Sequence, residues 1–574
     1  MKRFFWLASA LLACTVTVLT QRAAPPAAGP TLEALFAKPP AEYSTAPLWV
    51  WNDLLTDDMV LQTMRDLAGQ HVKQVFIHPR PGLMTPYLSA EWFRLWKLAL
   101  TEAERLDMRV WIYDENSYPS GFAGGFVPEA MPESRGMGLQ LREQPAPKWT
   151  EDTLAVFALG EGAARDISAA ARGGSPLPDG KYLVASIARA TPGPWYGGKF
   201  YVDLLRPGVT EKFLEVTLDA YKREIGGEFG KRVPGVFTDE PELRPAGGLP
   251  WTERLPQLFQ ERWGYSLLSN LPALAAPPSS GNGEASPASS GNGKPSPDTP
   301  AGDWKRARHN YYQLLLEQFV ERWGKPYYEY CERHGLEFTG HYWEHEWPGC
   351  GSVPDNMAMS AWQQRPGIDI LMNQYAEDVH AQFGNVRSVK ELASVANQLG
   401  RARTIAEGYG AGGWDLRFED MKRIGDWMYV LGINTLDQHL SYVSLRGARK
   451  RDHPQSFSYH EPWWDAYHAS ADYFSRLSVA MSAGEQVNDV LVIEPTTTAW
   501  MYNASGKQPP ELEALGKSFQ ELLLAFERAQ VEYDLGSEDI IRRHGAVEGN
   551  ARRVGRRPYR TVVVTPPPEN LNGP

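Results

Sequence analysis

The sequence predicts an α/β fold: an interrupted (β/α)8 TIM-type barrel with an inserted small β domain and the start of a C-terminal α/β domain. The first observation is a regular alternation of short apolar segments and amphipathic segments, which begins near residue 45. Such alternation is typical of a parallel sheet covered by helices. The second observation is that the apolar segments end in polar or charged residues. In a barrel these ends share one face, where active sites form.

The first three strand and helix units are the most regular. Thr56 is an N-cap signal, and the apolar residues that follow it include Met59, Val60, Met64 and Leu67, which suit one face of a helix. We expect strands at 48–52, 72–78 and 109–116, and helices from Thr56 onward and over 89–106.

The later units follow the same pattern after an interruption. With them the strand count reaches the eight that a closed barrel requires, and the barrel domain is expected to span 45–482. Strands are predicted at 233–242, 338–348, 365–373, 403–407 and 432–436, and helices at 210–225, 386–399, 414–431 and 463–481.

Two segments break the alternation. Between about 121 and 206, β-like runs at 153–159 and 181–189 are separated by Gly, Pro and Ala, which predicts the small inserted β domain. The stretch 277–300 repeats Ser-Ser-Gly-Asn-Gly and predicts a disordered surface loop. Because helical sequence flanks it at 255–263 and 304–333, this loop interrupts a helical layer rather than separating domains.

Residues 483–574 predict a second α/β domain. An apolar strand is expected at 487–493, a helix at 512–529 and a further strand at 560–564. The pattern stops before such a domain is complete, so we expect a C-terminal portion to be missing from this chain.

The first 24 residues have the features of an export signal. Lys2 and Arg3 precede an apolar run at 4–19, which is too short for a membrane span, and an Ala/Pro-rich, flexible mature N-terminus is expected at 25–44. The protein is therefore expected to be exported, to the periplasm or the outside, and Cys14 leaves a lipoprotein open. The remaining Cys331 and Cys350 provide neither a disulfide framework nor a zinc spacing.

Composition narrows the class of partner. A formal net charge of -11 argues against nucleic acid, which requires a basic face. The chain is rich in aromatic residues, with 20 Trp, 25 Tyr and 21 Phe, as carbohydrate-handling proteins often are. A basic run at 446–452 is predicted to be a solvated loop.

The densest group of reactive side chains lies at 338–348, with the sequence F-T-G-H-Y-W-E-H-E-W-P. Aromatic walls beside carboxylates are typical of a sugar site, although solvated acids and core tryptophans are the plain alternative. If the segment is extended, alternate side chains face opposite sides. One side would then carry His341, Trp343 and His345, and the other Tyr342, Glu344 and Glu346.

Glycoside hydrolysis needs two carboxyl groups, one as proton donor and one as base or nucleophile. We expect Glu344 or Glu346 to be the acid and Glu407 the base or nucleophile. Glu240 is the main rival for either role, unless Glu240 and Glu242 merely cap the next loop. Substrate hydroxyls or a metal are expected to be bound by Asp114, Glu115, Asp239 and His439. Further substrate contacts are expected from His78, Arg80 and His341, and sugar faces are expected to stack on Trp343, Trp347 and Trp414.

Six motifs in order resemble glycoside hydrolase family 106, the bacterial α-L-rhamnosidases, over about residues 45–480. The resemblance implies an interrupted (β/α)8 barrel, a bound calcium ion, and single-displacement hydrolysis of an α-L-rhamnosyl bond with inversion, by glutamates at barrel strand ends. The insertion at 277–300 and the early end of the chain depart from the family, whose members usually continue into β domains. The motifs are W-V-W-N (49–52), V-F-I-H-P-R-P-G-L (75–83), Y-D-E-N-S-Y-P-S-G-F-A-G-G (113–125), T-D-E-P-E (238–242), H-Y-W-E-H-E-W-P (341–348) and A-E-G-Y-G-A-G-G-W-D (406–415).

Other classes stay open at this point. A β-galactosidase-like retaining glycosidase also suits a barrel followed by an α/β domain, and carboxyl groups about 5 Å apart rather than about 6.5 to 9.5 Å would indicate it. A metal hydrolase could use His341 and His345 with a carboxylate. A non-catalytic carbohydrate-binding protein is the third alternative. The expected partner is an oligo- or polysaccharide that contains rhamnose, of plant or bacterial origin.

Overall fold

The computed structural model describes residues 29–160, 164–275, 303–565 and 569–572 of the 574-residue chain. The predicted export signal and the low-complexity segment lie outside these residues. Within the predicted flexible N-terminus, Leu32–Ala37 form helix α1, whose first turn is capped by the Thr31 hydroxyl. No helix was predicted in this segment. Among the described residues, no helix combines the length and apolar character needed to cross a membrane.

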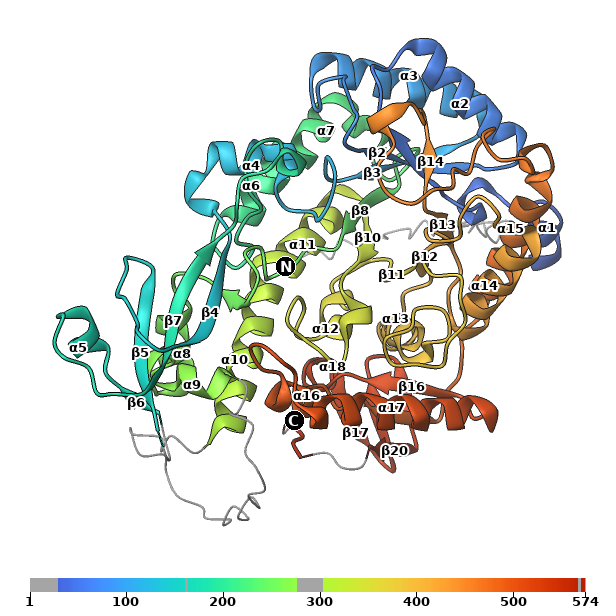
Figure 1. Ribbon diagram of the computed structural model, residues 1–574. Helices are drawn as coiled ribbons and strands as arrows, with labels where there is room; N and C mark the ends of the chain where they lie inside the picture. Colours follow the sequence, from blue (N-terminus) through green and yellow to red (C-terminus); the bar gives the residue numbers. More distant parts are fainter. Residues whose placement is uncertain (1–28, 161–163, 276–302, 566–568, 573–574) are drawn as a thin grey trace, which may run out of the picture.

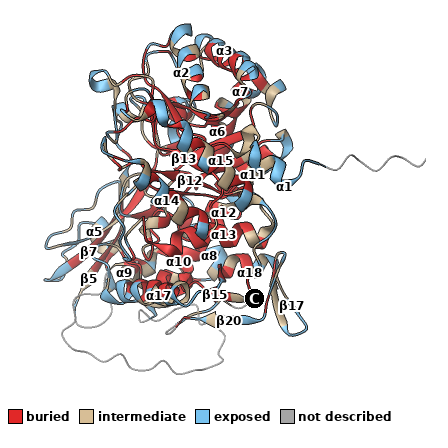
Figure 2. Ribbon diagram, turned by 90° about the vertical axis from the view of Figure 1, so that its right-hand side faces the viewer, coloured by how far each residue is buried: buried red, intermediate tan, exposed pale blue. Residues whose placement is uncertain are grey.

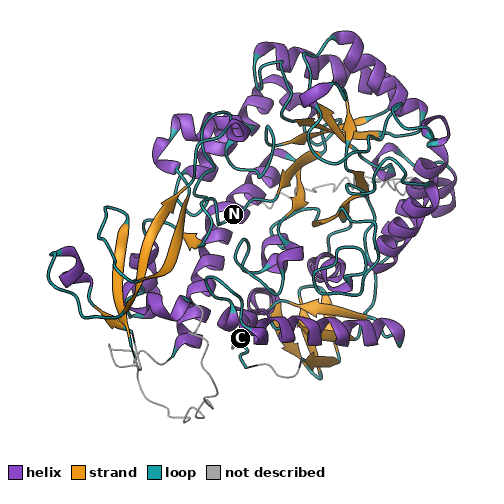
Figure 3. Ribbon diagram, viewed as in Figure 1, coloured by secondary structure: helices purple, strands orange, loops and turns teal. Residues whose placement is uncertain are grey.

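Two parallel sheets form the centre of the molecule (Figure 3). The first has six strands in the order β10-β8-β3-β2-β1-β14, and the second has three in the order β11-β12-β13. All pairings within them are parallel, as the sequence predicts. The strands are β1 (Leu48–Trp51), β2 (Gln74–Pro79), β3 (Arg109–Tyr113), β8 (Gly235–Asp239), β10 (Glu337–His341), β11 (Gly367–Ile370), β12 (Ile405–Gly408), β13 (Leu436–Gln438) and β14 (Ser441–Tyr442).

The two sheets meet at both of their edges. At one edge, the Arg365 N–H before β11 donates to the Phe338 carbonyl of β10 at 3.2 Å. At the other, β14 follows β13 directly in the chain, and the Ala46 N–H before β1 donates to the Leu436 carbonyl at 2.9 Å. The strand neighbours therefore follow one another in chain order, with the inserted sheet left out.

Side chains of the central strands alternate between two cores. Trp49 and Trp51 point outward, where their rings contact edge to face at 5.3 Å and Trp51 meets Trp92 of a covering helix at 4.9 Å. Leu48 and Val50 point inward, into a buried cluster with Phe76, Phe237 and Ile405 among others, from β2, β8 and β12. Since strand side chains alternate in this way, each central strand is buried on both faces.

Helices cover the outside of the central strands (Figure 1). Helix α2 begins where the Thr56 hydroxyl accepts from the Met59 N–H, and α3 begins where Ser89 caps Trp92, as predicted. The helices of this layer are α2 (Asp57–Gly69), α3 (Ala90–Leu106), α4 (Phe126–Ala130), α6 (Val209–Val216), α7 (Leu218–Ile225), α11 (Lys325–His334), α12 (Asn356–Ser360), α13 (Val386–Leu399), α14 (Phe418–Leu431) and α15 (His468–Ser482). Helices α8 (Leu255–Trp263), α9 (Leu271–Leu274) and α10 (Trp304–Phe319) pack on one another beside the inserted β region (Figure 1).

The inserted β region is a five-stranded antiparallel sheet in the order β6-β5-β7-β4-β9. Strands β5 (Thr153–Leu159) and β7 (Lys181–Arg189) coincide with the predicted β-like runs. The sheet extends beyond the predicted insertion, because β9 (Leu249–Trp251) comes from the chain after β8. The other members are β4 (Met137–Gln144) and β6 (Arg165–Asp166), with the short helix α5 (Ser168–Arg172) beside them.

The C-terminal region carries a separate three-stranded parallel sheet in the order β16-β15-β20. It packs below α12 and α13, whose residues are largely buried between this sheet and the central strands (Figure 2). The elements of the C-terminal region are β15 (Val490–Ile493), α16 (Thr496–Tyr502), α17 (Pro510–Arg528), β16 (Tyr533–Gly536), α18 (Glu538–His544), β17 (Gly545–Glu548), β18 (Ala551–Val554), β19 (Arg557–Tyr559) and β20 (Thr561–Val564).

Two predicted helices are interrupted in the structure, and one predicted strand begins later than expected. The helix at 210–225 breaks at Thr217, whose hydroxyl donates back to the Phe213 carbonyl at 2.6 Å. The helix at 304–333 is interrupted by a π-helical turn, Val320–Gly324, just before Pro326, which has no N–H to continue the α-helical pattern. The eighth strand begins at Leu436 rather than at residue 432, because 433–435 connect it to α14.

The segment 338–348 is not one extended strand. Strand β10 ends at His341, and Glu344–Glu346 form a turn of 3-10 helix. Gly340 has a φ of 112° and lies so close to the Thr238 carbonyl that a Cβ would stand 1.8 Å from it. The alternation of side chains that the extended interpretation requires is therefore lost beyond His341.

Arg387 joins three parts of the fold at the start of α13. Its side chain is fully buried, donates to Glu391 at 2.5 Å and lies 3.5 Å from Glu494 of the C-terminal region. It also donates to the Glu344 carbonyl of the 3-10 turn. Removal of this buried cation would leave buried Glu391 and the Glu344 carbonyl without their partner.

We therefore expect Arg387→Met to lower the free energy of unfolding by about 3 to 5 kcal/mol in urea denaturation. The matched control is Arg476→Met, because Arg476 is 40% exposed and 3.8 Å from Asp472. Removal of such a surface pair should cost about 0 to 1 kcal/mol. Equal losses in the two variants would contradict the role of Arg387.

Candidate active site

Buried acidic and basic side chains meet at the carboxyl ends of the central strands. The strand register pairs His341 with Asp239, Asp369 with Glu407, and Glu407 with Asp437. All five side chains are almost completely buried. Since parallel strands in register place their C-terminal residues side by side, the sequence brings these groups together from five strands.

His341 and Glu407 form the central contact of this group. His341 Nε2 lies 2.9 Å from Glu407 Oε2 and 3.7 Å from Asp239 Oδ1. Burial disfavours a charged imidazole, but the neighbouring carboxylates Glu407, Asp239 and Asp369 outweigh it and hold the pKa of His341 well above its usual range. A protonated His341 therefore compensates part of the negative charge.

Glu240 follows β8 directly and lies half-buried at the edge of the same group. Its φ of 44° is unusual for a residue with a side chain, and its carbonyl accepts from the Trp343 indole at 3.1 Å. Burial, together with Asp239 and the more distant acids, holds the pKa of Glu240 well above its usual range. This carboxyl group thus favours the protonated form while still reaching solvent.

The 3-10 turn after β10 separates the two rival glutamates. Glu344 is buried and its Oε1 accepts from the Asp369 N–H at 2.6 Å, so it belongs to the carboxylate group. Glu346 is turned away: it accepts from Arg244 at 2.5 Å and from the Ser352 N–H at 2.8 Å. The sequence left these two residues as equivalent candidates, whereas the turn gives them different surroundings.

Sequence analysis missed Asp369 and Asp437. Both are buried, and Asp369 Oδ1 and the two carboxylate oxygens of Asp437 have no hydrogen-bond partner among the described residues. Burial and the neighbouring Glu407 hold the pKa of both well above its usual range. An acid inside an apolar strand, as in G-I-D-I-L at 367–371, is the signal that could have found Asp369.

Asp114 and Glu115 organise a loop instead of facing a substrate. Both are completely buried, and Asp114 accepts from the hydroxyls of Ser120 and Tyr327. Glu115 accepts from five backbone N–H groups between Asn116 and Gly124. Their predicted role as ligands of hydroxyls is therefore corrected, because their oxygens are already bound within the protein.

The three candidate tryptophans have different surroundings. Trp343 is half-buried beside Glu240, where a sugar ring could reach it. Trp414 is 42% exposed on the loop after β12. Trp347 is buried against Phe519, with ring centroids 5.5 Å apart, and under the Arg387 guanidinium, so it is a core residue and not a sugar platform.

A chain of contacts links the strand ends of β2 and β14 to the carboxylate group. His78 stacks on Tyr113 and accepts from Arg80 Nε at 3.1 Å, while the other end of Arg80 donates to Asp452. Burial alone would raise the pKa of Asp452, but the charge and hydrogen bond of Arg80 bring it well below its usual range.

His439 completes this link to Glu407. Its Nε2 lies 3.9 Å from Asp452 and 3.6 Å from Glu407 Oε1. Burial and Arg80 hold the pKa of His439 well below its usual range, so this imidazole is neutral. The basic run 446–452, predicted to be a solvated loop, is therefore partly anchored at the site through Asp452.

Comparisons with known proteins show similarities of sequence and of fold. The family model for glycoside hydrolase family 106, described as alpha-L-rhamnosidase, matches residues 187–286. A relative from Formosa agariphila, provisionally named a beta-glucuronidase, is 24% identical over 359 residues, or 60% of this chain and 27% of that protein. The chain thus spans about a quarter of the length of this curated relative.

Solved structures show the same fold at low identity. A rhamnosidase from Novosphingobium sp. PP1Y has a TM-score of 0.65 at 15% identity, over 95% of this chain and 68% of that one. A catalytic mutant of a GH42 beta-galactosidase from G. stearothermophilus has a TM-score of 0.50 at 9% identity, over 87% of this chain and 67% of that one.

The sequence of residues 187–286 is similar to a glycoside hydrolase family, and the fold is similar to that of solved glycoside hydrolases. Within this class, the matched segment and the shared fold support the resemblance to family 106 that the motifs predict. The chain is accordingly rhamnosidase-like.

The loop after β3 provides a test of the Glu115 assignment. We expect Glu115→Gln to lower the free energy of unfolding by about 1 to 3 kcal/mol, because an amide cannot accept from all five N–H groups and its own NH2 lacks an acceptor. The exposed Glu133→Gln is the matched control and should change stability little. Urea denaturation measures both, and a Glu115→Gln protein as stable as its control would refute the assignment.

Proposed function

We propose that this chain belongs to an exported glycoside hydrolase that cleaves terminal α-L-rhamnosyl linkages with inversion of configuration. The observation that carries the proposal is the buried group of carboxyls around His341 and Glu407, with Glu240 at its open edge. Export rests on the basic and apolar character of residues 1–24.

We also propose that the central strands close into a (β/α)8 barrel. The two sheets adjoin at both edges through Arg365 with Phe338 and Ala46 with Leu436. The inner cluster supports closure, because Leu48 of β1 and Ile405 of β12 belong to the same buried core. In this arrangement the catalytic face is the carboxyl end of the strands.

Glu240 is the proton donor in this proposal. A general acid must keep its proton near neutral pH and must reach the glycosidic oxygen. Glu240 meets both needs, since its pKa is raised and its side chain is only half-buried. Glu344 is the rival candidate for the acid. One of its oxygens, however, already accepts from the Asp369 backbone N–H, and Glu344 is more deeply buried than Glu240.

Glu407 is the base. Burial raises the pKa of Glu407, but the contact with protonated His341 favours its ionised form and fixes its orientation. In the reaction, Glu240 gives its proton to the leaving oxygen while Glu407 takes a proton from water, and the water oxygen bonds to the anomeric carbon as the glycosidic bond breaks. Attack from the face opposite the leaving group inverts the anomeric configuration.

The donor set suits the calcium ion that the family resemblance implies. Calcium prefers oxygen ligands, and Asp369 has a buried oxygen without a partner next to Glu344. These two carboxylates would hold the ion, which when bound would bind sugar hydroxyls and offset the negative charge. Glu240, His341 and Asp369 also offer ligand atoms within 4.8 Å of one another, but protonated His341 cannot be a ligand.

The alternatives have less support. A metal hydrolase built on His341 and His345 conflicts with the ion pair of His341 and Glu407. A retaining β-galactosidase-like enzyme shares the fold, and a β-glucuronidase would follow the name of the Formosa relative. A non-catalytic module has no need for a proton-donating carboxyl beside a buried base.

The anomeric form of the first product tests the proposal. During hydrolysis of p-nitrophenyl α-L-rhamnoside, proton NMR in the first minutes should show β-L-rhamnose, because inversion produces it before mutarotation. Initial α-L-rhamnose would instead indicate a retaining enzyme. If folded protein releases no rhamnose but cleaves p-nitrophenyl β-D-glucuronide, the rhamnosidase proposal fails.

Glu240→Gln separates the role of acid from that of calcium ligand. We expect kcat/KM to fall about 10² to 10⁴-fold for a rhamnosyl disaccharide, whose leaving group needs a proton, and much less for the p-nitrophenyl rhamnoside. Glu407→Gln should reduce both, whereas Glu346→Gln should keep the wild-type ratio between the substrates. Calorimetric titration with calcium should show unchanged affinity in Glu240→Gln; loss of affinity would make Glu240 a ligand and leave Glu344 as the acid.

A further inference from the structure

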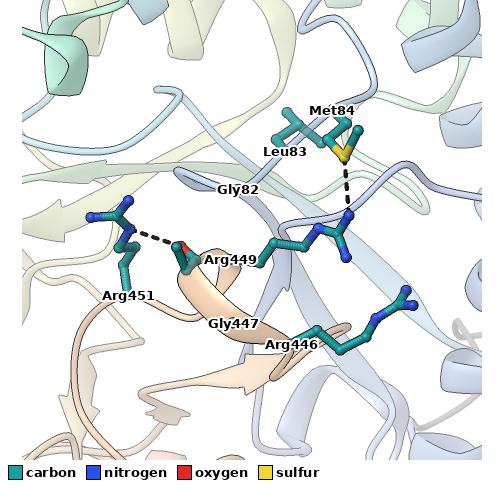
Figure 4. Close-up of a pocket in the computed structure, with 8 residues that line it drawn as sticks. Gly82, Leu83, Met84, Arg446, Gly447, Arg449 and Arg451 are labelled. Carbon is teal, nitrogen blue, oxygen red and sulfur yellow. Dashed lines mark hydrogen bonds between the residues drawn. The ribbon is translucent and has the colours of Figure 1, made fainter.

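A basic pocket lies beside the proposed active site, between two loops at the strand ends. Its volume is about 570 Å³, and it is lined by Gly82, Leu83, Met84, Arg446, Arg449 and Arg451 among others. Figure 4 shows Arg446 and Arg449 projecting to one side of the loop after β14, and Arg451 to the other. None of these residues has a part in the proposed hydrolysis.

The pocket carries more positive charge than its acidic neighbour can offset. Asp53 pairs with Arg446 at 2.7 Å and lies 3.4 Å from Arg449. Arg451 forms no ion pair within the described parts of the chain, and its Nε donates to the Ala448 carbonyl at 2.8 Å. The Arg446 side chain is 68% exposed and that of Arg449 31%, so their remaining donors reach solvent.

Contacts between loops connect the walls of the pocket to residues at the proposed active site. The loops are pressed together, since a Cβ on Gly82 would stand 2.7 Å from the Arg449 carbonyl. The Asn52 amide, at the end of β1, donates to that same carbonyl at 3.0 Å. Gly82 is two residues beyond Arg80, which binds Asp452 at the other end of the basic loop.

We propose that this pocket is an anion subsite, which binds the carboxylate or sulfate ester of the sugar unit next to the rhamnosyl group being cleaved. The inference rests on the proposed function, which supplies the rhamnosyl group. Arginine guanidinium groups recognise such planar or tetrahedral oxyanions through charge-assisted hydrogen bonds. The exposed Met84 side chain offers an apolar wall for the sugar ring beside the anion.

The net charge of the chain does not itself attract an anionic glycan. At -11, the protein as a whole repels polyanions at long range. Binding of an acidic glycan therefore has to come from short contacts inside this pocket. We infer that the natural substrate is an acidic glycan with its anionic group close to the scissile bond.

The inference is tested by measuring the binding of three disaccharides to the Glu407→Gln variant, which should bind them without hydrolysing them. They are α-L-rhamnosyl glucose, α-L-rhamnosyl glucuronate and α-L-rhamnosyl glucose 6-sulfate, with affinity measured by calorimetry. We expect at least one anionic disaccharide to bind about tenfold or more tightly than the neutral one. The anion that gains affinity identifies the source, and the gain should shrink at high salt.

Adding Arg449→Gln and Arg451→Gln to this variant should erase the preference and leave affinity for the neutral disaccharide unchanged. Arg446 remains in this variant to pair with Asp53. The control is the exposed Arg142→Gln on β4, which should keep the preference. Equal affinity for all three disaccharides, or an equal loss for all three in the arginine variant, would overturn the anion subsite.

Ligands without rhamnose separate this inference from the proposed function. Methyl β-D-glucuronide and methyl β-D-glucoside 6-sulfate should bind the pocket more tightly than methyl β-D-glucoside. If they do while no rhamnoside is bound or cleaved, the rhamnosidase proposal fails and the pocket stands as an anion site. If rhamnosides are cleaved with no preference for either anion, the subsite is wrong and the proposed function stands.

Discussion

The contact between His341 and Glu407 is the interaction on which the site depends. Several carboxyl groups end their strands within a shared, water-poor space, and their mutual repulsion would oppose folding if nothing compensated it. A protonated His341, 2.9 Å from Glu407, supplies a positive charge inside the group. In the proposed mechanism, this contact favours the ionised form of Glu407, while the raised pKa of Glu240 favours its protonated form, and these are the two states that acid and base catalysis requires.

Two buried arginines, Arg387 and Arg80, extend this pattern of charge compensation away from His341 and Glu407. Below these two residues, Arg387 holds the carbonyl of Glu344 and reaches Glu494, so the turn that carries Glu344 is tied to the C-terminal region. Toward the loops, Arg80 binds Asp452 beside the neutral imidazole of His439. The position of the acidic side chains is therefore fixed by residues of distant segments, which explains why an α/β region outside the central strands contributes to the site.

The sequence predicted the strands well and the site unevenly. Apolar runs with helices between them are local patterns, so β5, β7 and α13 were placed at their observed bounds. The positions of Glu344 and Glu346 depend on a 3-10 turn after Gly340, whose backbone conformation is set by contact with β8. Asp114 and Glu115 look like site residues because they end a strand, but the loop that follows folds back onto Glu115, and Tyr327 from a distant helix binds Asp114. No spacing rule reveals either contact.

The basic run after β14 shows how the same residues acquire different roles from their surroundings. In the sequence, a series of arginines and a lysine followed by an acid is typical of a solvated loop. In the fold, Asp452 is held at the site by Arg80, and this anchor keeps the preceding arginines at the mouth beside β1 and β2. A flexible loop would lose considerable conformational entropy when it binds an anion. An anchored loop has already lost most of that entropy on folding, so binding costs it less. The acidic centre and the basic rim are thus coupled through one ion pair, and selectivity for an acidic glycan would arise from the loop that helps to hold the catalytic groups.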